Sequence, residues 1–127
     1  MTKGKNIASW VIQAVLIILF LLMGSGKLMS DPEVVANFKH WGMPDGSYYV
    51  IGAFEILGAI GLMIPRLAGY AAMGLILLMF GALFTHITHG EFGGMPMLAI
   101  LVIILAGAVI YLRDPLKFFA KKPETGE

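Results

Sequence analysis

Four long apolar stretches, separated by short polar segments, take up most of this 127-residue chain. They cover about residues 7–28, 48–64, 67–85 and 95–112. Hydrophobic residues make up 58% of the chain and charged residues 13%, against about 45–50% and about 25% in ordinary globular domains. A soluble fold would leave much of this apolar surface facing water, whereas a lipid bilayer accepts it. The sequence therefore predicts an all-α integral membrane protein, in which residues 1–127 form a single domain, a four-helix bundle.

The first apolar stretch also has features of a secretory signal peptide. It follows the basic residues Lys3 and Lys5 and ends in the small residues 24–26. Its apolar part is longer than the core of about 7–15 residues in signal peptides, and no A-x-A cleavage site follows. As a helix it would extend roughly 33 Å, enough to cross a bilayer. We expect it to remain as the first membrane span.

A short interfacial helix is predicted between the first two spans, over about residues 32–41. Asp31 can cap it, Pro32 suits its first position, and Glu33 suits its first turn. Its apolar residues share one face, so the helix would lie on the membrane interface as a lid over the bundle or as a simple connector. These residues are Val34, Val35, Phe38 and Trp41.

Lysine and arginine are distributed unequally over the two predicted sides of the membrane. Seven fall on the side of the termini and two on the opposite side. Because basic loops favour the cytoplasm, we expect a multi-pass protein of the bacterial inner membrane with both termini cytoplasmic. The seven are Lys3, Lys5, Arg66, Arg113, Lys117, Lys121 and Lys122, and the two are Lys27 and Lys39. Basic residues at helix ends, without a continuous stripe, give no indication of nucleic-acid binding.

Sixteen glycines occur in the chain, several of them inside the predicted spans. Glycine is a poor helix former, but in lipid it allows helix backbones to approach closely. The sequence therefore predicts a tightly packed bundle.

Glu55 is the most informative polar residue, because it lies about seven positions inside the second span. A charged carboxylate there costs about 2.5–3.5 kcal/mol on insertion scales, so it must be protonated, paired or in contact with water. It serves either a function or a structural hydrogen bond. The first span carries a polar stripe that includes Gln13 and Lys27. Lys27 either pairs with Glu55 or extends to the interface.

Three histidines and Glu91 are predicted to share the membrane side of Lys27. The candidate ligand site is Lys27, Glu55, His86 and His89, with Gln13, His40, Trp41, Tyr48 and Glu91 as secondary members. The H-x-x-H spacing of His86 and His89 also allows a zinc or copper site, although this pattern is weakly specific. A quinone would instead use histidine or lysine as hydrogen-bond donors and aromatic side chains as walls. No catalytic residue is assigned. The chain has no cysteine, which excludes a disulfide, a thiol relay or a cysteine-bound metal within it.

Several short motifs between Gly24 and Glu91 resemble those of the DoxX-like family of small four-helix bacterial membrane proteins. They are G-x-x-K-L at Gly24–Leu28, F-x-x-x-G-x-P at Phe38–Pro44, I-G-x-x-E-x-x-G at Ile51–Gly58, I-P-R at Ile64–Arg66 and G-A-x-x-T-H at Gly81–His86. The resemblance implies a compact four-helix membrane bundle. It also implies a redox association, since the family takes its name from a thiosulfate:quinone oxidoreductase.

The residues and the resemblance together predict an accessory protein rather than a catalyst acting alone. We expect it to bind a quinone or a lipid, or to dock onto a membrane redox complex. Its other expected partners are membrane lipid and further copies of itself. Two alternatives stay open: a structural or interaction subunit of a larger membrane complex, and a transporter of a small solute or protons that uses Glu55 as a carrier.

Overall fold

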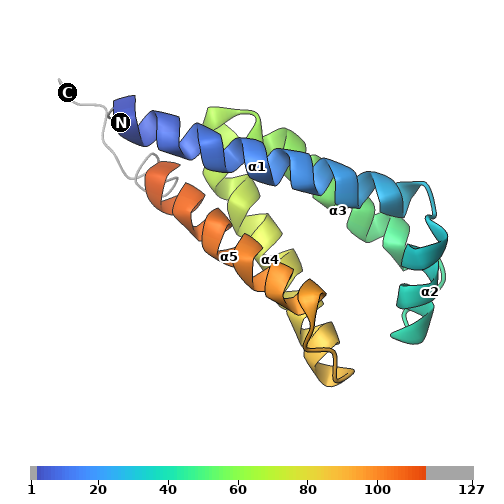
Figure 1. Ribbon diagram of the computed structural model, residues 1–127. Helices are drawn as coiled ribbons and strands as arrows, with labels where there is room; N and C mark the ends of the chain where they lie inside the picture. Colours follow the sequence, from blue (N-terminus) through green and yellow to red (C-terminus); the bar gives the residue numbers. More distant parts are fainter. Residues whose placement is uncertain (1–2, 114–127) are drawn as a thin grey trace.

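The computed structural model describes residues 3–113, which form five helices and no strand (Figure 1). The all-α fold predicted from the sequence is confirmed. The basic residues Lys117, Lys121 and Lys122, which entered the topology prediction, lie outside the described residues. The helices are α1 (Lys3–Leu28), α2 (Pro32–His40), α3 (Ser47–Leu62), α4 (Pro65–Thr88) and α5 (Gly94–Arg113).

The helix boundaries differ from the predicted ones at the start of α1, which begins at Lys3 and not near residue 7, and at both ends of α4. Pro65 opens this helix, because proline has no N–H to lose at a first helical position and its fixed φ suits the start of a helix. At the other end α4 continues to Thr88, so His86 lies in its last turn and not in the following loop. In α2 the predicted cap is present, since the Asp31 carboxylate accepts a hydrogen bond from the Glu33 N–H.

The helices are arranged as two pairs, in which α1 packs on α3 and α4 packs on α5. The pairs lie close together at the end that holds the start of α1 and the end of α5, and they diverge toward α2 (Figure 1). At the closed end the Arg113 Nη1 donates a hydrogen bond to the Asn6 Oδ1 at 3.0 Å. The core between the pairs includes the fully buried Leu16, Phe20 and Val102.

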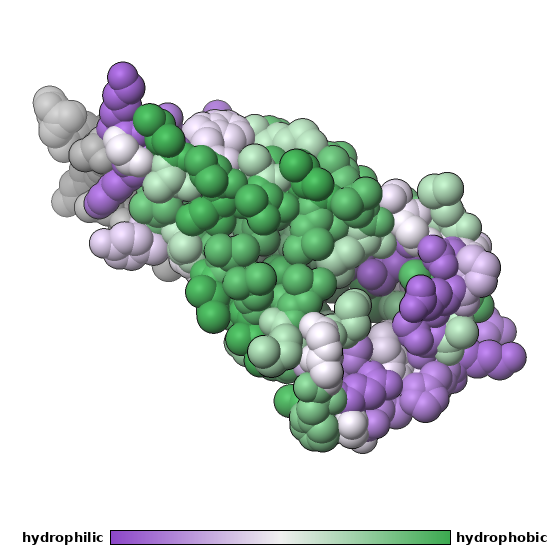
Figure 2. All heavy atoms as spheres, in the orientation of Figure 1, coloured by the Kyte–Doolittle hydropathy of each residue, from purple (hydrophilic) through white to green (hydrophobic). Residues whose placement is uncertain are grey.

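The face of the bundle seen in Figure 2 is apolar along its middle and polar at its two ends. Three helices, α1, α4 and α5, are long and apolar enough to cross a membrane. Apolar side chains such as Leu22 and Leu77 are about two-thirds exposed on the outer surface of the bundle, as expected where lipid is the solvent. The 16 residues of α3 would extend about 24 Å, less than the roughly 30 Å of a bilayer core. A fourth crossing by α3 stays a prediction.

A crossing of two glycines brings α1 against α3. A Cβ atom built on Gly52 would lie 2.7 Å from the Lys27 Cβ and 3.0 Å from the Gly24 carbonyl oxygen. A Cβ atom on Gly24 would lie 3.0 Å from the Gly52 carbonyl oxygen. Only glycine permits this approach of the two backbones. The crossing places Lys27 directly beside the helix that carries Glu55.

Candidate ligand-binding chamber

A chamber of about 460 Å³ lies between the two helix pairs, where they diverge. All five helices contribute to its wall, and α2 lies at the end of the bundle where the two helix pairs diverge (Figure 1). Most of the wall is apolar or glycine, and the polar side chains in it are few. Among the lining residues are Met23, Lys27, Asn37, Phe38, Trp41, Glu55, Gly81, Thr85, His86 and Ala99. Its size falls within the range of small-molecule sites, about 300–1,000 Å³.

Lys27 and Glu55 form an ion pair in this wall. The Lys27 Nζ lies 3.0 Å from the Glu55 Oε1, and the two side chains are 14% and 2% exposed. The sequence left two alternatives for Lys27, pairing with Glu55 or extension to the interface, and the structure shows the pairing. The ion pair removes the net charge of the two groups but leaves a strong dipole in an apolar cavity. Such a dipole can orient the polar end of a bound molecule.

Glu91 connects three aromatic side chains at the mouth of the chamber. It follows α4 in the loop before α5, and its Oε1 accepts hydrogen bonds from the His86 Nδ1 at 2.7 Å and the Trp41 Nε1 at 3.1 Å. The His40 Nε2 lies 3.6 Å from its other carboxylate oxygen. The Trp41 ring meets the His86 ring edge to face, with centroids 5.2 Å apart. Glu91 therefore holds the end of α2 against α4.

The remaining predicted residues do not line the chamber. The His89 side chain is exposed, and its Nδ1 lies 2.9 Å from the Thr85 carbonyl oxygen. Tyr48 of α3 packs against Phe38 of α2, with ring centroids 5.9 Å apart, and so helps to hold α2 against α3. His40 pairs with Glu91, with its Nε2 3.6 Å from the Glu91 Oε2, and lies against the His89 ring. The structure thus brings Lys27, Glu55, His86 and Trp41 together around one cavity and leaves His89 outside it.

Gln13 lies at the closed end of the bundle, away from the chamber. Its Nε2 donates a hydrogen bond to the Leu62 carbonyl oxygen at 2.6 Å, and its Oε1 accepts from Ser9 and Arg113. Leu62 is the last residue of α3, where backbone carbonyls lose their helical partners. Gln13 therefore supplies a hydrogen-bond donor to a carbonyl oxygen at the end of α3 and connects α1 with α3 and α5. Its role is structural.

The metal site that the histidine spacing allowed is not formed within residues 3–113. No group of three His, Asp or Glu side chains in this range is arranged to hold a metal ion. The reason is local: the His86 Nδ1 is bonded to Glu91, whereas the His89 Nδ1 faces the backbone of its own helix.

Four methionines and an asparagine in the chamber wall were not among the predicted site residues. They are Met23, Met43, Met79, Met95 and Asn37. The methionines are scattered along the sequence, and only the fold brings them together. A signal was present for Met23, which lies one helical turn before Lys27 and therefore shares its face. Flexible methionine side chains adapt to molecules of different shape.

A family model described as the DoxX-like family matches residues 11–109. The chain belongs to the DoxX-like family. The match contains every residue of this DoxX-like chamber, from Met23 to Ala99. No curated protein and no solved structure matches the chain.

The contact between Glu91 and Trp41 is expected to depend on pH. The hydrogen bond from His86 is the main cause that holds the pKa of Glu91 below its ordinary value of 4.5. Partial desolvation acts in the opposite direction, and Trp41 and the charges of His86 and His40 contribute further lowering. A lowered pKa means that the contact persists at pH 4.5 and is lost as the pH falls through a lower value.

Tryptophan fluorescence would measure this transition in a Trp10→Phe variant, in which Trp41 is the remaining tryptophan. We expect the emission of Trp41 to change with a midpoint below pH 4.5. Glu91→Gln removes the titrating carboxyl and should abolish that change. The same transition in the Gln variant would show that another group is responsible.

Proposed function

We propose that this protein binds a small membrane-soluble molecule, of quinone or lipid type, in the chamber. It would act as an accessory component of a membrane redox system, by binding and orienting the molecule, without covalent catalysis. The observation that carries this proposal is the Lys27–Glu55 ion pair in the wall of an otherwise apolar cavity of about 460 Å³.

An ion pair at this position is poorly explained by stability alone. Replacing a buried ion pair with apolar residues of similar volume is often neutral or stabilising. Charged groups inside membrane spans are therefore functional candidates by default, and more so when they face a cavity. In the chamber, Lys27 offers donors to an oxygen atom of a ligand, and Phe38 and Trp41 offer flat apolar surfaces.

A quinone is one ligand that this wall would suit. Its carbonyl oxygens accept hydrogen bonds, which the Lys27 ammonium and the Asn37 amide can donate. Its ring would lie against aromatic and methionine side chains. The redox association that the DoxX-like resemblance implies supports this ligand, and a chain without cysteine would need such a bound redox molecule or a partner to take part in electron transfer.

The proposal includes a location in the bacterial inner membrane with both termini in the cytoplasm. The contact between Arg113 and Asn6 places the start of α1 and the end of α5 at the same end of the bundle, and the excess of basic residues on that side is the argument for the cytoplasm. If α3 is counted as the fourth crossing, the chain crosses the membrane an even number of times, and its two ends must then lie on the same side.

Native mass spectrometry of the protein released from membranes would test the binding proposal. Gly81 lines the chamber, and a Cβ built on it has no atom within 4 Å. Gly81→Leu should therefore fill the cavity without disturbing the backbone. We expect a small molecule to accompany the wild type and to be reduced about tenfold or more in Gly81→Leu, a loss of about 1.4 kcal/mol or more.

Gly107→Leu is the matched control, because Gly107 also lies in a long helix with open space at its Cβ, and it does not line the chamber. This variant should retain the bound molecule. Equal retention in both variants would overturn the proposal. A protein partner in stoichiometric amount, with no small molecule, would favour the interaction-subunit alternative; altered solute flux in Glu55→Gln would favour transport.

A further inference from the structure

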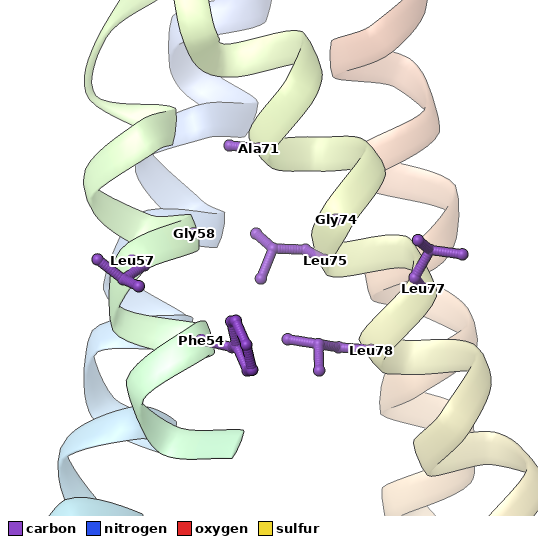
Figure 3. Close-up of a pocket in the computed structure, with 8 residues that line it drawn as sticks. All are labelled: Phe54, Leu57, Gly58, Ala71, Gly74, Leu75, Leu77 and Leu78. Carbon is purple, nitrogen blue, oxygen red and sulfur yellow. The ribbon is translucent and has the colours of Figure 1, made fainter. Parts of the chain in front are cut away.

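A second cavity of about 490 Å³ lies between α3 and α4, on the apolar surface of the bundle (Figure 3). Its wall contains no polar side chain. In Figure 3, Phe54 of α3 and Leu78 of α4 point toward one another across it. We call it the α3–α4 cleft; its lining residues are Phe54, Leu57, Gly58, Ala71, Gly74, Leu75, Leu77 and Leu78.

The cleft and the chamber share part of their walls. Leu77 and Leu78 line both cavities, and the neighbouring residues Phe54 and Glu55 line one each. The side chains of Leu77 and Leu78 therefore lie at the boundary between the two cavities. Leu77 is 73% exposed, and exposed side chains change rotamer within picoseconds to nanoseconds.

The charges around the chamber restrict the head group of a ligand. The Lys27 ammonium is already neutralised by Glu55 at 3.0 Å. The Nδ1 of His86 likewise faces a carboxylate, the Glu91 Oε1, at 2.7 Å. Both basic side chains in the chamber wall are therefore already paired with an acid and offer no unpaired positive charge to an anionic head group. A neutral head with a hydroxyl or carbonyl oxygen fits best.

We propose that the ligand is a neutral single-chain amphiphile whose head lies in the chamber and whose apolar tail leaves over Leu77 and Leu78 into the α3–α4 cleft. This inference rests on the proposed function and adds the class of ligand and its route to the bilayer. A tail that passes from lipid into the cleft stays in an apolar environment throughout. Tail length should therefore have little effect on affinity while the cleft is open.

Two glycines allow the head and the tail sites to be blocked separately. Gly74 lines the cleft, Gly81 lines the chamber, and a Cβ on either has no atom within 4 Å. Gly74→Leu should obstruct the tail and Gly81→Leu the head. Propylphenol and dodecylphenol serve as probes with the same neutral hydroxyl head and different tails. Gly107→Leu is again the control.

Binding would be measured in nanodiscs of a single phosphatidylcholine, from the fluorescence of Trp41 in the Trp10→Phe background. Affinities are expressed per mole fraction of probe in the bilayer. We expect Gly74→Leu to weaken dodecylphenol binding about tenfold and to leave propylphenol binding unchanged. Gly81→Leu should weaken both probes, and Gly107→Leu neither.

The outcomes separate the two proposals. Equal binding of dodecylphenol to wild type and Gly74→Leu would overturn the tail route and leave the chamber proposal standing. Loss of propylphenol binding in Gly74→Leu would also overturn it, because the effect would then not depend on the tail. Unchanged binding of both probes in Gly81→Leu would overturn the chamber proposal itself.

Discussion

Replacing Glu55 with leucine is expected to lower the free energy of unfolding by about 3–5 kcal/mol, because it leaves the Lys27 ammonium without its counter-charge. The Lys27 side chain is 14% exposed, so water can solvate it only in part. Reversible unfolding in mixed micelles, followed by far-ultraviolet circular dichroism, would measure this loss.

The double variant Lys27→Met with Glu55→Leu distinguishes the effect of an unpaired Lys27 ammonium from the effect of losing the Glu55 side chain itself. Removing both charges eliminates the uncompensated ammonium, and we expect most of the stability to return. The folded double variant should still lack the bound small molecule, because the polar contacts for its head are gone. Equal destabilisation in the single and double variants would contradict a direct coupling between Lys27 and Glu55.

Replacing Gly52 with alanine is expected to destabilise the bundle by about 1–3 kcal/mol, the usual effect of overpacking a tight contact. The added Cβ would lie 2.7 Å from the Lys27 Cβ and 3.0 Å from the Gly24 carbonyl oxygen. Neither atom is the far end of a flexible side chain, so α1 and α3 must separate. Unfolding in the same micelles would measure the effect.

The separation should also disturb the ion pair, since Lys27 is the residue that the new methyl group displaces. We therefore expect Gly52→Ala to reduce ligand binding as well as stability. Gly107→Ala is the control: its Cβ meets no atom within 4 Å, and alanine favours the helix by up to about 1 kcal/mol. If Gly52→Ala proved as stable as this control, the close crossing of α1 and α3 would be wrong.

The membrane class and the positions of the helices followed from the sequence because they depend on local properties. Apolar stretches of spanning length, the cap at Asp31 and the break near Pro65 each act within a few residues. The helical period likewise predicted a polar stripe on the first span that includes Gln13 and Lys27; Gln13 is buried, and the Lys27 side chain is 14% exposed. The end of α4 was predicted too early, since His86 and Thr88 continue a helix that their polarity suggested had ended.

The sequence also showed that the carboxyl group of Glu55 inside α3 must be protonated, paired or in contact with water, and that Lys27 either pairs with it or extends to the interface. It did not decide between them, because periodicity gives the face of one helix and not its orientation toward another. The glycines illustrate the same limit. Gly52 and Gly107 look alike in the sequence, yet one permits a helix crossing and the other faces open space.

The amino-acid sequence was sufficient to establish that this chain is a helical membrane protein, to identify the polar residues that cost free energy to bury, and to place the helix ends to within a few positions. Which of these polar residues contact one another depended on the fold. Lys27 and Glu55 pair, His86 and Trp41 both bind Glu91, and Gln13 serves the opposite end of the bundle. The divergence of the two helix pairs also creates the chamber. Hydrophobicity and helix capping act locally along a chain, whereas a cavity and an ion pair depend on packing between helices far apart in sequence.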